Sequence, residues 1–292
     1  MPLKLLAILA HPDDESLGFG GTLATYAAAG VEVSLVMATR GEAGRYREHR
    51  RGSPEHPGAE ALARIREAEL RAAAAILGIG DIAFLEYRDQ ELDRADPREA
   101  IARIVHQLRR TRPDVVLTFA QDGAYGHPDH IAICQFATAA VAVSADPSFA
   151  SGDGDVPHRV AKLYYIAWPA STWAAYEHAL QRLISVVDGV ERQAIPWPDW
   201  SLSAVIDTRA TWETVWRAVS CHESQMGIFA RLEDLSPELH QALWGAQSFY
   251  RVMSTVNGGR QQETDGERYQ TAPCTRRVRF RCAQNASHPR QQ

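Results

Sequence analysis

Cysteine is scarce in this chain, and the few cysteines lie far apart. Cys134, Cys221, Cys274 and Cys282 are spread over 292 residues with no CxxC pair. A disulfide framework is therefore not expected in a chain of this length, and reduced thiols in a cytoplasmic protein are the simpler interpretation. Cys134 lies in an apolar helical pattern, so we interpret it as a core residue and not as a metal ligand.

An excess of positive charge is also lacking. The formal net charge is −5, with 31 Lys and Arg against 36 Asp and Glu. Because non-specific affinity for nucleic acid depends on clustered Lys and Arg side chains, nucleic acid is not an expected partner.

Long hydrophobic runs are missing as well. The apolar stretch 131–145 contains Gln135, Thr138 and Ser144 and is shorter than the roughly 20 residues that a helix needs to cross a bilayer. The run 3–10 at the N-terminus meets charged residues at once, with no small-residue cleavage site after it, which favours a buried strand over a signal peptide. We expect neither a membrane segment nor export from the cytoplasm.

Short aliphatic runs alternate with longer helical patterns. The predicted strands are 3–10, 31–37, 82–87, 115–119 and 163–168, and the predicted helices are 17–29, 58–77, 98–110 and 129–144. This alternation predicts an α/β fold with a mostly parallel, Rossmann-like sheet and helices on both faces. Ligands bind at the carboxyl ends of the strands in such sheets, which directs attention to the loops after residues 10, 37 and 119.

The pattern changes after about residue 169. Tryptophan-rich helical segments follow, and we interpret residues 169–262 as a C-terminal helical subdomain that shares its core with the rest of one domain, 1–262. Residues 263–292 have few aliphatic side chains and a basic character, so we predict a poorly ordered tail.

Two polar motifs stand at predicted strand ends. One is His11-Pro12-Asp13-Asp14-Glu15, and the other is Tyr125-Gly126-His127-Pro128-Asp129-His130. Two histidines and a carboxylate around an open position form a common ligand set for catalytic zinc, and non-haem iron uses the same set. Either motif alone is also compatible with helix capping, and we prefer that role for Glu15.

The remaining groups in the two motifs favour hydrolysis over redox chemistry. Asp13 adjoins a candidate ligand and is placed to act as a general base, while His127 lies three residues before His130 and is placed to face the substrate carbonyl. Asp129 is placed to hold His127 in one tautomer.

With these residues the chain resembles the LmbE-like or PIG-L superfamily of N-acetylglucosaminyl deacetylases. The pattern AHPDDE plus HPDH stands at residues 10–15 and 127–130. The similarity continues through Thr39-Arg40-Gly41-Glu42-Ala43-Gly44, through the Arg66 to Gly78 helix, and to His222-Glu223-Ser224-Gln225. It covers most of residues 1 to about 260.

The resemblance implies a zinc-dependent deacetylase, with ferrous iron as the alternative metal, whose ligands are His11, Asp14 and His130. It also implies that Asp13 is the base, that His127 stabilises the oxyanion, and that Asp129 supports His127. In the mechanism we expect, His127 acts as an imidazolium. By the same resemblance Tyr125 lies near the scissile carbonyl and Arg66 contacts sugar hydroxyls; for Arg66 a solvated helix face is the alternative, and for His222 a satisfied buried histidine.

The expected substrate is a small amino-sugar conjugate. Thiol-sugar conjugates, phosphatidylinositol-linked sugars and glycopeptides all occur in the family, so the group attached to the sugar stays open. A metal-binding protein without catalysis and a nucleotide-binding module are the rival functions, and the latter lacks a G-x-G-x-x-G turn after the first strand. Either a monomer or a homo-oligomer is compatible with the sequence.

A long loop follows the second predicted strand. Residues 41–58 are far more than the two to six that usually join a strand to a helix, and they include Arg45, Arg47, Arg50 and Arg51. We expect this loop, through residues such as Arg47, to contact an anionic or polar group beyond the sugar, with a solvated surface loop as the alternative.

Overall fold

We describe the protein from a computed structural model that covers residues 2–152, 154–180, 184–187, 189–193 and 195–256. The predicted tail 263–292 lies outside these described residues, as do Cys274 and Cys282.

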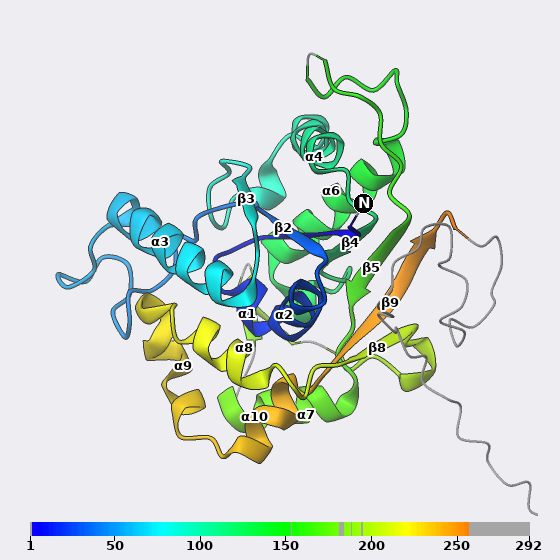
Figure 1. Ribbon diagram of the computed structural model, residues 1–292. Coiled ribbons are helices and arrows are strands. Elements are labelled where there is room, and N and C mark those ends of the chain that lie inside the picture. The colour runs from blue at the N-terminus through cyan, green and yellow to red at the C-terminus, as the bar shows by residue number, and fades with distance from the viewer. Residues whose placement is uncertain (1, 153, 181–183, 188, 194, 257–292) are drawn as a thin grey trace, which may run out of the picture.

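A seven-stranded sheet runs through the middle of the protein (Figure 1). Its spatial order is β3-β2-β1-β4-β5-β9-β8. The strands are β1 (Lys4–Leu9), β2 (Glu32–Met37), β3 (Asp81–Phe84), β4 (Val115–Thr118), β5 (Lys162–Ile166), β8 (Ala204–Asp207) and β9 (Ala246–Ser254). The first five pair in parallel, whereas β9 is antiparallel to both β5 and β8. The predicted α/β class with a mostly parallel sheet is confirmed.

Helices cover both faces of this sheet. They are α1 (Asp14–Leu17), α2 (Gly20–Ala28), α3 (Ala59–Leu77), α4 (Pro97–Thr111), α5 (Gly123–Gly126), α6 (Pro128–Val143), α7 (Ala170–Leu180), α8 (Trp212–Val219), α9 (Met226–Glu233) and α10 (Pro237–Trp244). The pair α4 and α6 packs on one face, and α2 and α3 lie on the other (Figure 1).

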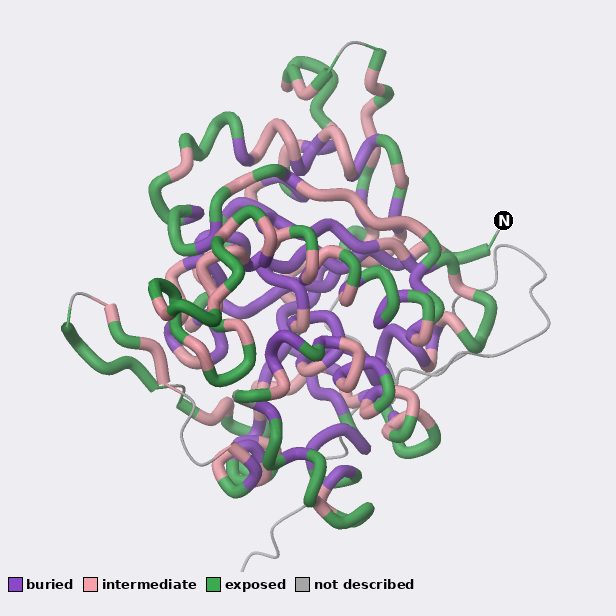
Figure 2. The backbone as a smooth tube through the Cα atoms, turned by 90° about the vertical axis from the view of Figure 1, so that its left-hand side faces the viewer, coloured by how far each residue is buried: buried purple, intermediate pink, exposed green. Residues whose placement is uncertain are grey.

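The core is built around β1. Residues 5–10 are each at most 3% exposed, and the partner strands on both sides are apolar as well. Such continuous apolar runs are typical of parallel strands that are covered on both faces. Figure 2 shows these buried segments at the centre of the molecule, with exposed backbone around them. The motif after β1 therefore starts from a rigid position.

The region after Pro169 differs from the sequence prediction. The expected helical segments are present as α7 to α10, but β8 and β9 also add two antiparallel strands to the sheet, and β6 (Ile184–Val187) and β7 (Val190–Gln193) form a separate hairpin. The strands were missed because β9 carries polar and apolar residues in an irregular order, and its pairing partner β5 is distant in the sequence.

A second apolar cluster joins the C-terminal helices; its buried residues are Tyr176, Ala179, Val215, Val219, Phe229, Leu232, Leu243 and Trp244. In the described part of the chain, no helix combines the length and apolar character of a membrane span.

Candidate functional site

The two polar motifs meet because their strands are neighbours. Leu5 pairs with Val115, so β1 and β4 end at the same edge of the sheet. His11 follows β1 directly, and Asp14 begins α1. His130 lies in the first turn of α6, whose start is fixed by His127 as N-cap residue.

The three predicted ligands face one another. His11 Nδ1 is 3.2 Å from His130 Nε2, although the residues are 119 positions apart. Oxygens of Asp14 lie 3.7 Å from His11 Nδ1 and 3.4 Å from His130 Nε2. A tetrahedral zinc with bonds of about 2.0–2.1 Å separates its ligand atoms by about 3.4 Å, so the set fits such an ion.

In each histidine ring, the outer nitrogen, which points away from the other candidate ligands, contacts an acceptor, as is usual for a histidine that binds metal. His130 Nδ1 is 3.2 Å from the carbonyl oxygen of Gly123, which can only accept a hydrogen bond. His11 Nε2 lies 3.1 Å from carboxylate oxygens of both Asp89 and Asp129. Each ring therefore carries a proton on its outer nitrogen, and the inner nitrogen is the one that can offer a lone pair to a metal.

Charges at the site favour ionised ligands. Burial alone would raise the pKa of Asp14, but His130 and His11 lower it to about 2. Burial likewise opposes ionisation of Asp89, yet His11 and Arg66 shift its pKa well below the usual range. Both carboxylates are consequently negative at neutral pH, as cation binding requires.

The partner of Asp129 differs from our expectation. Its carboxylate contacts His11 Nε2 and accepts the backbone N–H groups of Gln90 and Leu92, at 2.7 and 3.2 Å. Its link to His127 is through its own backbone N–H instead. Asp129 thus orients His11, a candidate metal ligand, because the first turn of α6 directs its side chain toward this residue.

Sequence reasoning missed Asp89. It is 8% exposed, accepts the backbone N–H of Ala43 at 3.0 Å, and contacts His11 from the side opposite Asp14. Asp89 follows the third parallel strand. A search for carboxylates after every predicted strand could therefore have found it.

His127 lies against both histidine ligands, with ring centroids 4.8 Å from His11 and 4.7 Å from His130. Its Nδ1 accepts the backbone N–H of Asp129 at 3.2 Å, which places the ring proton on Nε2. Burial, His11 and His130 lower the pKa of His127 to about 3. This direction favours a neutral ring with one N–H to donate, and the expected imidazolium stays a prediction.

Asp13 has an unusual backbone. Its φ of 111° falls in the region that favours glycine. Its Oδ2 lies 3.0 Å from Arg66 Nη2. Burial, opposed by Arg66, raises the pKa of Asp13 to about 7. Strained backbone of this kind persists where surrounding contacts over-determine it, and it concentrates at functional sites.

Tyr125 completes one side of the site. Its ring centroid is 6.0 Å from that of His127 and 5.4 Å from that of His130. Burial, together with Asp14 and Asp13, shifts the pKa of the Tyr125 phenol far above its usual range. The hydroxyl consequently stays protonated and is available as a donor.

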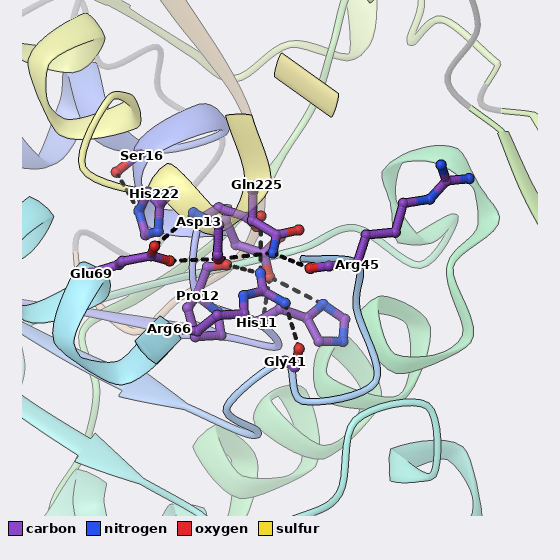
Figure 3. A network of polar contacts seen from close by, with 12 residues as sticks. His11, Pro12, Asp13, Ser16, Gly41, Arg45, Arg66, Glu69, His222 and Gln225 are labelled. Atoms are coloured by element: carbon purple, nitrogen blue, oxygen red, sulfur yellow. Dashed lines mark hydrogen bonds and ion pairs between the residues drawn. The ribbon is translucent and has the colours of Figure 1, made fainter. Parts of the chain in front are cut away.

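Arg66 is buried, with 4% of its surface exposed. Its Nη1 donates to the Gly41 carbonyl at 2.7 Å, and its Nη2 contacts the Pro12 carbonyl and Asp13 (Figure 3). Both ends of the guanidinium therefore bind protein groups. Arg66 thereby joins three segments of the site, a role that the resemblance did not imply.

The loop 41–58 begins beside Arg66 and then turns outward. The backbone N–H of Arg47 donates to the Ser224 carbonyl at 2.5 Å, while the side chains of Arg45 and Arg47 are exposed. Figure 3 shows the Arg45 side chain pointing away from the polar network. These guanidinium groups lie at the rim and not among the ligands.

Fold and site together define a class: metal-dependent hydrolases built at the carboxyl edge of a Rossmann-like sheet. Within that class the chain belongs to the PIG-L family, described as GlcNAc-PI de-N-acetylase, whose sequence profile matches residues 6–141. A relative from Geodermatophilus obscurus, a 1D-myo-inositol 2-acetamido-2-deoxy-alpha-D-glucopyranoside deacetylase, is 34% identical over 278 residues, covering 87% of this chain and 93% of the relative.

Solved structures share the fold. The N,N'-diacetylchitobiose deacetylase from Pyrococcus horikoshii has a TM-score of 0.63 and 25% identity, covering 85% of this chain and 83% of that one. A 4-carboxy-2-hydroxymuconate hydratase from Pseudomonas putida also has a TM-score of 0.63, at 18% identity, covering 88% of this chain and 99% of that one. Because a hydratase shares the fold, the fold alone does not decide the reaction, and the site must do so.

Proposed function

We propose that this protein is a metal-dependent hydrolase that removes the acetyl group from an N-acetylglucosamine conjugate. The observation that carries the proposal is the cluster of His11, Asp14 and His130, whose nitrogen and oxygen atoms lie 3.2–3.7 Å apart. His127 lies beside this cluster, and Asp13 is next to Asp14 in the chain. Relatives more than 30% identical over most of the chain are named as deacetylases of a glucosamine–inositol conjugate, which supports inositol as the attached group.

Zinc is the metal we propose, because the ligand spacing suits tetrahedral bonds of about 2.0–2.1 Å. When bound, the metal would polarise the acetamide carbonyl and make an attacking water more acidic. His11 is held for this by Asp89 and Asp129, and His130 by the Gly123 carbonyl.

Side chains of the protein would carry out the proton transfers and stabilise the negative charge that develops on the carbonyl oxygen. Asp13 takes a proton from the attacking water, and its pKa of about 7 suits both taking the proton and returning it to the departing amine. His127 donates its Nε2–H to the carbonyl oxygen as negative charge develops there. Tyr125, held protonated, is placed to add a second donor. We propose that Arg66 positions Asp13 and does not contact the sugar.

The rim of the site offers a reason for substrate choice. Arg45 and Arg47 have exposed guanidinium groups on the loop whose root contacts Arg66 and Asp89. We propose that they contact polar or anionic groups beyond the sugar ring, since arginine binds such groups in a bidentate manner.

Amine release is the decisive assay. The purified protein, loaded with zinc, should release a primary amine from the glucosamine–inositol conjugate faster than from free N-acetylglucosamine, diacetylchitobiose or a glycopeptide. A preference for one of the other substrates would replace the inositol conjugate. Stoichiometric metal with no amine release from any of them would favour a metal-binding protein without catalysis.

A further inference from the structure

A buried ion pair stands beside the base. Glu15 and His222 are both 0% exposed, and His222 Nε2 lies 2.8 Å from Glu15 Oε1, although 207 positions separate them. The Ser16 hydroxyl donates to the same oxygen at 2.5 Å. A carboxylate with no access to water is costly unless it is paired and hydrogen-bonded, so this pair requires an explanation.

The second carboxylate oxygen of Glu15 bonds to the backbone of Asp13, the proposed base. Glu15 Oε2 accepts the backbone N–H of Asp13 at 3.0 Å. Asp13 is the residue with a φ of 111°, a strained backbone conformation for any residue other than glycine. Hydrogen bonds to charged groups are stronger than bonds between neutral groups, so the bond that Asp13 donates to Glu15 helps to hold this conformation.

Helix capping explains only part of this geometry. Asp13 is the N-cap residue of α1, and Glu15 does accept its N–H. However, α1 is only four residues long, and an exposed carboxylate would cap it equally well. Capping does not explain why the Glu15 carboxylate is completely buried and paired with His222, a residue 207 positions away.

The segment that carries His222 is held by hydrogen bonds to α3 and to the loop 41–58. Ser224 donates through its N–H and its hydroxyl to Glu69 on α3, both at 2.7 Å. Gln225 Nε2 donates to the Arg45 carbonyl at 2.9 Å. Figure 3 shows His222 and Gln225 on either side of Asp13, with Arg66 below. The His222 segment thus fixes both the Asp13 neighbourhood and the root of the loop.

We propose that Glu15 and His222 are a positioning pair that holds the strained Asp13 backbone so that its carboxylate faces the reacting water. The inference rests on Asp13 being the general base, as in the proposed function. Without the pair, Asp13 relaxes toward an ordinary backbone conformation and its carboxylate moves out of line, while the metal ligands stay in place.

Two substitutions of one residue test the proposal. His222→Gln keeps an amide N–H near the position of Nε2, so it can still donate to Glu15. His222→Asn places its amide near Nδ1, which has no hydrogen-bond partner among the described residues, and it loses the bond to Glu15. We expect His222→Asn to lower kcat by about 10–100-fold with KM and bound metal unchanged, and His222→Gln to recover most of that loss.

Glu15→Gln gives an independent test that preserves shape. It replaces a carboxylate that accepts three hydrogen bonds by an amide with one acceptor oxygen, so the bonds from Asp13, Ser16 and His222 cannot all be kept as they are. The expected result is the same loss of kcat at constant KM. This variant decides the question if His222→Asn does not fold.

His240→Asn is the matched control. His240 is also buried, at 5% exposed, and its Nε2 donates to the Leu232 carbonyl at 2.8 Å, in the C-terminal aromatic cluster. It should lower the unfolding temperature without changing kcat. If His222→Asn matches this control, with kcat intact, the positioning role is refuted.

Asp13→Asn distinguishes failure of the positioning role from failure of the proposed function. Full activity in that variant would refute the assignment of Asp13 as the base.

Discussion

Replacing Gly41 by alanine tests how strongly the site depends on Arg66. Gly41 has a φ of 66°, and an added Cβ would overlap the Arg66 guanidinium. The backbone conformation alone costs an alanine about 1–2 kcal/mol. Displacing Arg66 adds at least one lost charged hydrogen bond, to the Gly41 carbonyl or to Asp13, at about 1.5–3 kcal/mol each. We therefore expect a loss of about 2.5–5 kcal/mol in the free energy of unfolding.

Gly30 supplies the control for this experiment. It has a φ of 85°, and nothing lies within 4 Å of an added Cβ. Gly30→Ala should therefore lose only the backbone part, about 1–2 kcal/mol, and keep its kcat. Urea unfolding and amine release would be measured for both variants. If Gly41→Ala equals Gly30→Ala in stability and keeps wild-type kcat, Arg66 neither joins the segments nor positions Asp13.

Four further predictions concern the remaining residues of the site. His130→Ala should lose bound zinc and activity together, as measured by metal analysis of the purified variant, and retained stoichiometric metal would contradict the ligand assignment. Asp13→Asn should keep the metal but lose about two to four orders of magnitude in kcat, and near-normal turnover would indicate another base. His127→Ala should lower kcat by about 10²–10³-fold without changing the shape of the pH profile, because the ring stays neutral; loss of one limb of the profile would show that it titrates. Arg45→Ala combined with Arg47→Ala should raise KM for the natural conjugate and leave free N-acetylglucosamine unaffected, whereas equal losses on both would indicate a structural role.

The sequence was most informative where local pattern determines structure. The first five strands were predicted to within about three residues at each end, because continuous apolar runs mark parallel strands covered on both faces. The meeting of His11 with His130 followed from the rule that parallel strands end at one edge. That rule needs no knowledge of side-chain contacts.

The parts that were missed depend on long-range contacts. Asp129 was paired with its sequence neighbour His127, yet its carboxylate meets His11, more than 100 positions away. The bond between His222 and Glu15 depends on how the C-terminal subdomain packs, which no local pattern encodes. Strand β9 was missed for the same reason, since its irregular pattern becomes a strand only against β5.

The central position of β1 and β4 has a consequence for how the protein folds. The proposed ligands His11 and His130 are 119 positions apart and meet only after β1 has paired with β4. Before that pairing, the unfolded chain would offer a metal ion isolated side chains and no preformed site. A metal bound at these residues therefore cannot guide the early steps of folding. Its binding energy acts on the finished sheet, and we expect it to slow unfolding far more than it speeds folding.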